Sequence, residues 1–161
     1  MSKNGRYDIL CWIRDFLIFL VIFIVLFQVV LGISRIDGTS MADTLQDGKT
    51  VFFLRTVCQY QVGDVVAARM GNGDLYVKRI VAQGGDVVDL RDGVLYVNEK
   101  PKSEEYAKGE TWPMVDGIEF PYTVKEGCFF LMGDNRESSE DSRMFGALPT
   151  ESLQGRLFGC N

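Results

Sequence analysis

The chain of 161 residues contains no histidine, and this absence removes several kinds of catalytic site. A Ser-His-Asp triad, a Cys-His pair and an H-E-x-x-H zinc site all need an imidazole, so none of them can form within the chain. Any nucleophilic side chain must therefore rely on another base. A lysine amine is a recognised partner of a serine nucleophile.

Cysteine is scarce, and basic charge is not in excess. The four cysteines have no C-x-x-C spacing, so neither a disulfide framework nor a metal site is indicated. Residues 34–161 carry 14 Lys or Arg against 20 Asp or Glu, a formal charge of −6. Because nucleic acid binding requires a basic face, we expect no nucleic acid partner. No motif indicates a cofactor.

One long apolar run lies near the N-terminus. Phe16 to Ile33 comprises 18 residues in which Gln28 is the only polar side chain. At about 1.5 Å per residue, a helix of this length reaches about 27 Å and can span a bilayer. A cleaved signal peptide is the main alternative, but the run is longer than a typical signal core and no small-x-small cleavage pattern follows it. We therefore predict a transmembrane anchor at 16–33.

Charge on either side of the run predicts its orientation. Lys3, Arg6 and Arg14 precede it, whereas Arg35 alone follows closely. Basic residues accumulate on the cytoplasmic side of membrane segments. We expect a single-pass protein of the cell membrane, in contact with the lipid bilayer, with a cytoplasmic segment at 1–15 and an extracytoplasmic domain at 34–161.

The part after the run is predicted to be mostly β. Short segments rich in Val, Tyr, Phe and Leu alternate with Gly and Asp turns, which is typical of strands and hairpins. The expected strands are 50–55, 64–70, 74–82, 86–90, 94–98, one beginning near Gly127 and one near 155–159. The pair joined by "RDG" is the strongest hairpin signal. Residues 100–126 are expected to form an excursion, and helices in this part are expected to be short or absent.

Three polar clusters could carry chemistry. Ser40 follows Gly38 in a turn-prone stretch, where backbone N–H groups could bind an oxyanion. Lys78 is the only lysine with hydrophobic strand residues on both sides, and burial there would lower its pKa. The loop 133–143 holds several acids, arginines and hydroxyls. Taken singly, each cluster is more typical of a surface turn or a solvent-facing strand position.

Taken together and in order, the clusters resemble the bacterial type I signal peptidases, which are membrane-anchored Ser-Lys endopeptidases. The matching stretches are "DGTSMADTLQDG", "DLYVKRIVAQGGD" and "LMGDNRESSEDSRMFG". The resemblance implies a β-barrel-like catalytic domain, and secretory preproteins with small residues at −1 and −3 as partners. It favours the compact Gram-positive type, because Gly38 stands where other members have a hydroxyl residue.

The same resemblance implies residue roles. Ser40 would be the nucleophile and Lys78 the general base, with the oxyanion bound by backbone amides, mainly that of Ser40, in the segment that contains Gly38. The supporting residues would be Ser139, which orients the lysine amine, the ion pair of Asp141 with Arg143, and Asp134. Shallow substrate subsites would be lined by Ile36, Met41, Leu45, Tyr76 and Val77. The chain departs from the family pattern at Asp43, where proline is usual.

Two other functions stay open at this point. One is a Ser-Lys maturation peptidase with a narrower substrate. The other is a non-catalytic, membrane-anchored β domain that binds a partner. Cleavage of an ordinary secretory precursor distinguishes the first from a signal peptidase, and labelling of Ser40 by an acylating probe excludes the second.

Overall fold

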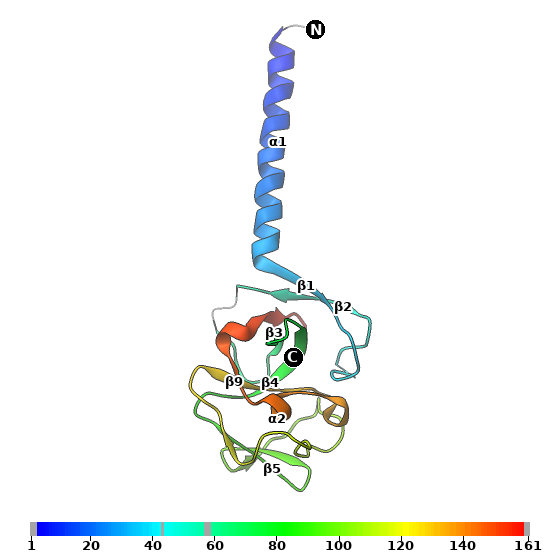
Figure 1. The fold of residues 1–161 in the computed structure, drawn as a ribbon. Coiled ribbons are helices and arrows are strands. Elements are labelled where there is room, and N and C mark those ends of the chain that lie inside the picture. The colour runs from blue at the N-terminus through cyan, green and yellow to red at the C-terminus, as the bar shows by residue number, and fades with distance from the viewer. Residues whose placement is uncertain (1–2, 43, 57–58, 160–161) are drawn as a thin grey trace.

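A single long helix precedes a β domain in the computed structural model, which describes residues 3–42, 44–56 and 59–159. Helix α1 (Lys3–Val30) projects from one end of the β domain, with the N-terminus at its far end (Figure 1). Its apolar part, Ile9–Val30, is 22 residues long and makes no buried contact with the domain. By length and composition this part can cross a membrane.

The helix ends three residues before the end of the predicted membrane segment. Leu31 begins strand β1 (Leu31–Arg35), which pairs antiparallel with β2 (Thr50–Leu54) from Leu31↔Leu54 to Arg35↔Thr50. Gly32 is buried in this strand, and the ring of Phe53 occupies the space where a Cβ would lie, at 2.2 Å. Glycine is a poor helix former, and pairing with β2 supplies partners for the backbone groups along one edge of this strand. Residues 31–33 therefore belong to the sheet.

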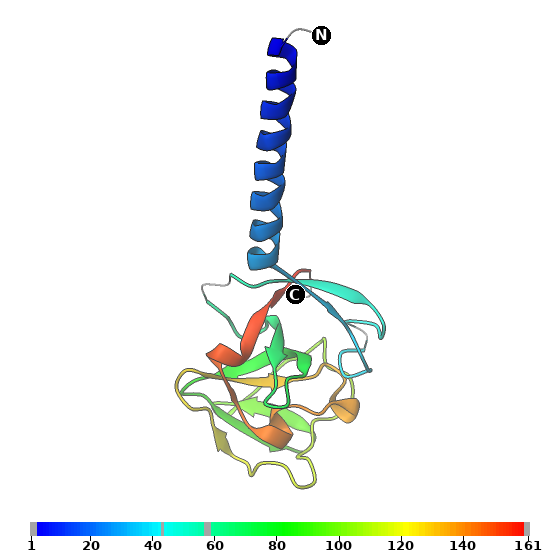
Figure 2. The same ribbon diagram turned by 45° about the horizontal axis from the view of Figure 1, so that its top comes forward.

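Two sheets make up the β domain, as the mostly β prediction required. The first contains seven strands in the order β1-β2-β11-β3-β4-β9-β10, and the second contains four in the order β7-β6-β5-β8. The remaining strands are β3 (Val65–Arg69), β4 (Leu75–Gln83), β5 (Val87–Arg91), β6 (Val94–Val97), β7 (Lys100–Pro101), β8 (Tyr122–Thr123), β9 (Cys128–Met132), β10 (Leu148–Pro149) and β11 (Leu153–Leu157). Figure 2 shows β1 and β2 lying between α1 and the rest of the domain.

Helices in the β domain are short, as expected. They are α2 (Ser142–Phe145) and the 3-10 turns η1 (Arg136–Ser138) and η2 (Thr150–Ser152). The hairpin of β5 and β6 turns through Asp92 and Gly93, with φ of +50° and +76°. Positive φ at both central residues defines the turn type whose twist suits a two-residue hairpin. The "RDG" signal therefore has its expected structural basis.

The core is built from the inner faces of both sheets. One cluster, which includes Ile36, Met41, Val51, Phe53 and Val77, lies beneath the Ser40 segment and the first half of β4. A second cluster, around Phe130 and Val88, lies between the two sheets. These clusters fix the Ser40 segment and β4 on a common apolar base.

Candidate active site

A groove of about 890 Å³ runs between β1 and the first half of β4. Both Ser40 and Lys78 lie in its wall. The complete lining is Ile33, Ser34, Arg35, Ile36, Asp37, Gly38, Thr39, Ser40, Met41, Asp74, Leu75, Tyr76, Val77, Lys78, Ser138 and Glu140. Two of the three polar clusters of the sequence therefore meet in the groove, and the third contributes Ser138 and Glu140 to its rim.

Ser40 is held in a tight turn after β1. The Gly38 amide donates to Asp47 Oδ1 at 2.8 Å, and the Ala42 amide donates to the Thr39 carbonyl at 2.9 Å. Gly38 has a φ of +99°, a conformation that glycine adopts without strain. Met41 is only 1% exposed and packs into the core. The turn therefore leaves Ser40 at the groove while its neighbour anchors the segment.

Lys78 lies in the middle of β4 and is 4% exposed. Burial lowers its pKa from 10.5 to about 8, although the charges of Asp141 and Glu140 act in the opposite direction. With a pKa near 8, roughly one-fifth of the amine is neutral at pH 7.4, compared with about one part in a thousand for an ordinary lysine. The structure thus supplies a usable base where histidine is lacking.

The lysine amine has a defined partner in the loop 133–143. Its Nζ donates to Ser139 Oγ at 3.1 Å, and both side chains are buried. The Tyr76 ring centroid lies 5.5 Å from the same nitrogen. Because Ser139 accepts one N–H of the amine, it restricts the directions in which the nitrogen lone pair can point.

Gly133 allows the Ser40 segment and the Ser139 loop to pack closely. A Cβ at this position would meet Ser139 Oγ at 2.2 Å and the Ser40 carbonyl oxygen at 2.6 Å. Only a residue without a side chain leaves this space free. The glycine of the "GDN" stretch is therefore explained by packing.

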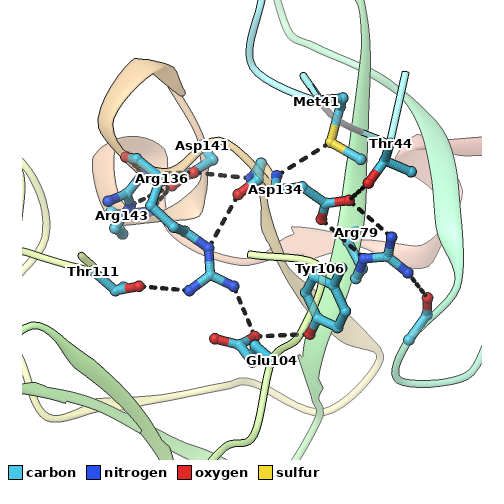
Figure 3. Close-up of polar contacts among 12 residues, drawn as sticks. Met41, Thr44, Arg79, Glu104, Tyr106, Thr111, Asp134, Arg136, Asp141 and Arg143 are labelled. Carbon is cyan, nitrogen blue, oxygen red and sulfur yellow. Dashed lines mark hydrogen bonds and ion pairs between the residues drawn. The ribbon is translucent and has the colours of Figure 1, made fainter. Parts of the chain in front are cut away.

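Asp134 joins β4, the strand of Lys78, to the segment that follows Ser40 (Figure 3). Arg79, which follows Lys78 in β4, donates to Asp134 from Nε at 2.9 Å and from Nη2 at 2.8 Å. Thr44 Oγ1 donates to the same carboxylate, and the Asp134 amide contacts Met41 Sδ at 3.4 Å. A bidentate, buried pair of this kind fixes orientation as well as distance.

Asp141 and Arg143 form a second buried ion pair (Figure 3). Arg143 donates to Asp141 from Nε at 2.9 Å and from Nη2 at 3.0 Å, and Asp141 accepts the Gly133 amide at 3.1 Å. Arg143 Nη2 also donates to the carbonyls of Arg136 and Ser139. The pair therefore holds the loop that presents Ser139.

The excursion 100–126 supplies residues that the sequence analysis did not single out. Arg136 donates to Glu104 Oε1 at 2.7 Å, to Thr111 Oγ1 at 2.6 Å and to the Gly133 carbonyl at 3.1 Å. Tyr106 donates to Glu104, and its ring lies beneath the Arg79 guanidinium, 4.0 Å from ring centroid to Cζ. Burial is the main cause that raises the pKa of Tyr106, so the phenol stays neutral. No local pattern marks these residues, because their partners lie about 30 residues away.

The predicted subsite residues are only partly brought together. Ile36, Met41, Tyr76 and Val77 line the groove. Leu45 does not line it, although it belongs to the same core cluster as Ile36, Met41 and Val77. Asp43 lies outside the described residues.

Comparison with known families gives one match over nearly the whole chain. The model described as "Signal peptidase, peptidase S26" matches residues 9–160. Signal peptidase I of Bacillus licheniformis is 32% identical over 152 residues, which cover 88% of this chain and 82% of the relative. Signal peptidase IB of Staphylococcus aureus is 30% identical over 171 residues, covering 94% and 88%.

A chloroplast relative and a solved structure give the same match. Thylakoidal processing peptidase 1 of Arabidopsis thaliana is 35% identical over 141 residues, covering 76% of this chain and 39% of the relative. The crystal structure of a signal peptidase I from Enterococcus faecalis aligns with a TM-score of 0.55 at 30% identity. That alignment covers 63% of this chain and 99% of the other.

Proposed function

We propose, on the premise that this chain belongs to the peptidase S26 family of signal peptidases, that Ser40 is its nucleophile and Lys78 its general base. Membership makes the chain a serine endopeptidase of the Ser-Lys type, which removes signal peptides from secretory preproteins. The observation that carries the residue assignment is the groove itself, which brings Ser40 together with a buried lysine of lowered pKa.

The chemistry follows from the two side chains. Ser40 Oγ attacks the scissile carbonyl carbon while Lys78 Nζ accepts the hydroxyl proton. The lysine then gives that proton to the leaving nitrogen, and the C–N bond breaks. A water molecule, deprotonated by the same amine, attacks the acyl-enzyme and releases Ser40. Ser139 Oγ, 3.1 Å from Nζ, orients the amine throughout.

The oxyanion site rests on the Ser40 amide. The Gly38 amide is engaged with Asp47 Oδ1 and is not available to a substrate. Among the described residues, the Ser40 N–H has no hydrogen-bond acceptor. A donor that is free in the resting protein and adjacent to the nucleophile is placed to bind the negative charge that develops on the carbonyl oxygen.

The substrate binds as an added strand. Among the residues that the structure describes, β1 pairs only with β2, and residues 75–78 of β4 pair only with β3, because pairing with β9 begins at Arg79. Both edges border the groove and offer unpaired backbone groups to an extended peptide. In such a peptide the residues at −1 and −3 point the same way. Ile36, Met41, Tyr76 and Val77 line the groove and would form the subsites for these small side chains.

The apolar helix serves as the membrane anchor, with the N-terminus in the cytoplasm and the β domain outside. Lys3, Arg6 and Arg14 lie on the N-terminal side, against Arg35 beyond it. A preprotein held by its own apolar segment in the same bilayer presents its cleavage site beside the domain.

A cleavage assay with matched controls tests this assignment. The full chain in lipid vesicles is given a preprotein with Ala at −1 and −3. Ser40→Ala and Lys78→Ala are expected to abolish cleavage, whereas Ser103→Ala and Lys49→Ala, which alter exposed side chains, retain it. Cleavage by either site variant at the rate of the unchanged chain disproves the dyad.

A further inference from the structure

Asn135 holds both peptide groups that flank Ser40. Its backbone N–H donates to the Ser40 carbonyl at 3.0 Å, and its side-chain Nδ2 donates to the Thr39 carbonyl at 3.1 Å. A carbonyl oxygen can only accept a hydrogen bond, so the side chain must present its NH₂ group to Thr39. The neighbouring "GDN" residues were assigned roles above, but Asn135 was not.

The hydrogen bond to the Thr39 carbonyl also fixes the Ser40 N–H, which lies on the opposite side of the same peptide group. Among the described residues the only cis peptide is Phe120–Pro121, so the Thr39–Ser40 peptide is trans. In a planar trans peptide the C=O and the following N–H point in opposite directions. Because the Asn135 side chain donates to the Thr39 carbonyl, the Ser40 N–H points away from Asn135.

The Ser40 N–H turned in this way faces the groove side of the segment. Thr39 and Ser40 line the groove, and Asn135 does not. Asn135 is itself fixed from behind, because the Lys108 amide donates to the Asp134 carbonyl at 2.7 Å and the Arg136 amide donates to the Lys108 carbonyl at 2.9 Å. The support of the Ser40 peptide thus extends back into the excursion 100–126.

We propose that Asn135 is a positioning residue that aims the Ser40 amide at the oxygen of the scissile carbonyl. This inference rests on the proposed function. In this role Asn135 acts on the substrate through the Thr39–Ser40 peptide and not by direct contact. It therefore stabilises the transition state, in which the oxyanion forms. Ground-state binding of an extended peptide along β1 and β4 does not depend on it.

Asn135→Asp gives the sharpest test, because it keeps the shape of the side chain and removes the donor. Loss of an oxyanion donor costs about 10²- to 10³-fold in kcat, so misdirecting the donor is expected to lower kcat about 10- to 100-fold. KM for a preprotein should change less than about 2-fold. Asn135→Ala removes the same bond without adding a charge and should show the same division between kcat and KM.

Two inhibitors separate positioning from a general loss of structure. Ser40 Oγ adds to the carbon of a peptide aldehyde, the C=O double bond becomes a C–O⁻ single bond, and Lys78 takes the serine proton. The matching peptide alcohol binds without reaction. Asn135→Asp should weaken binding of the aldehyde by the same factor by which it lowers kcat. It should leave binding of the alcohol unchanged. Glu137→Gln serves as comparator, because it alters an exposed side chain of the same loop that does not line the groove, and it should leave the binding of both inhibitors unchanged.

The outcomes distinguish failure of the positioning role of Asn135 from failure of the proposed Ser-Lys peptidase function. Equal weakening of aldehyde and alcohol by Asn135→Asp and Asn135→Ala, or an unchanged kcat in both, overturns the positioning role while the dyad stands. Failure of the unchanged chain to cleave any preprotein overturns the proposed function, and the inference with it.

Discussion

At the scale of single residues, the site depends on what surrounds Lys78. The chain lacks histidine, and its proposed base is an amine that is 4% exposed within a β strand. Desolvation disfavours the ammonium form, whereas Asp141 and Glu140 partly restore it. The balance leaves the pKa at about 8, which is close enough to neutral pH for proton transfer in both directions.

The pH dependence of cleavage follows from this pKa. The base must be deprotonated to act, so log(kcat/KM) is expected to rise by about one per pH unit below pH 8 and to level off above it. The measurement is a pH–rate profile on a short soluble peptide, between pH 6 and 10 or so. A profile that still climbs at pH 10 would mean that Lys78 titrates like an exposed lysine.

At the scale of elements, the excursion 100–126 supports the loop 133–143. Glu104 and Arg136 form an ion pair whose side chains are 8% and 1% exposed. Arg136 also binds the carbonyl of Gly133, the residue that packs against Ser40 and Ser139. A segment that looks like a surface insertion in the sequence thus reaches the back of the site.

Removal of one partner of this pair should be costly. Glu104→Ala leaves a buried guanidinium without its counter-charge and is expected to lower the free energy of unfolding by about 3 kcal/mol. Glu105→Ala, at the exposed neighbouring position, should change it by less than about 0.5 kcal/mol. Urea denaturation of the full chain in mild detergent measures both. Equal stability of the two variants would show that the pair contributes nothing.

How far the sequence predicts an element depends on whether its cause is local. The strands around Val66, Ile80 and Phe130 carry their own apolar patterns, and the prediction found them. β7 and β8 are two residues each and exist because neighbouring strands pair with them, so no local signal marks them.

The residues of the site likewise fall into those that the local sequence predicts and those that it does not. Ser40, Lys78 and the loop 133–143 could be picked out by composition and order. Glu104 and Tyr106 could not, because only the fold brings them to Arg136 and Arg79. Leu45 is the opposite case, because it lies close to Ser40 in the sequence and yet does not line the groove.

At the scale of the whole molecule, the anchor and the groove form one connected unit. α1 ends at Val30, and β1, which lines the groove, begins at the next residue. Arg55 donates two hydrogen bonds to this junction, from its backbone N–H to the Val30 carbonyl at 2.9 Å and from its side-chain Nε to the Leu31 carbonyl at 3.2 Å. The groove is therefore held at a set distance from the end of the helix.

Insertion of four Gly-Ser residues between Val30 and Leu31 tests the importance of this junction. The insertion frees the domain to move relative to the bilayer, so cleavage of a preprotein in vesicles is expected to fall about 10-fold or more. Cleavage of a short soluble peptide, which needs no fixed distance, should change less than about 2-fold. Equal rates on both substrates would show that the distance to the membrane is immaterial.

The two unpaired edges that border the groove have a further consequence for its substrates. An edge can add only a chain whose own backbone groups are free, and a segment already paired within a folded protein has none to give. In the proposed binding mode, cleavage therefore requires that the residues around the scissile bond are not paired with the rest of the exported protein. The groove would then select for an unpaired segment of chain as well as for small side chains.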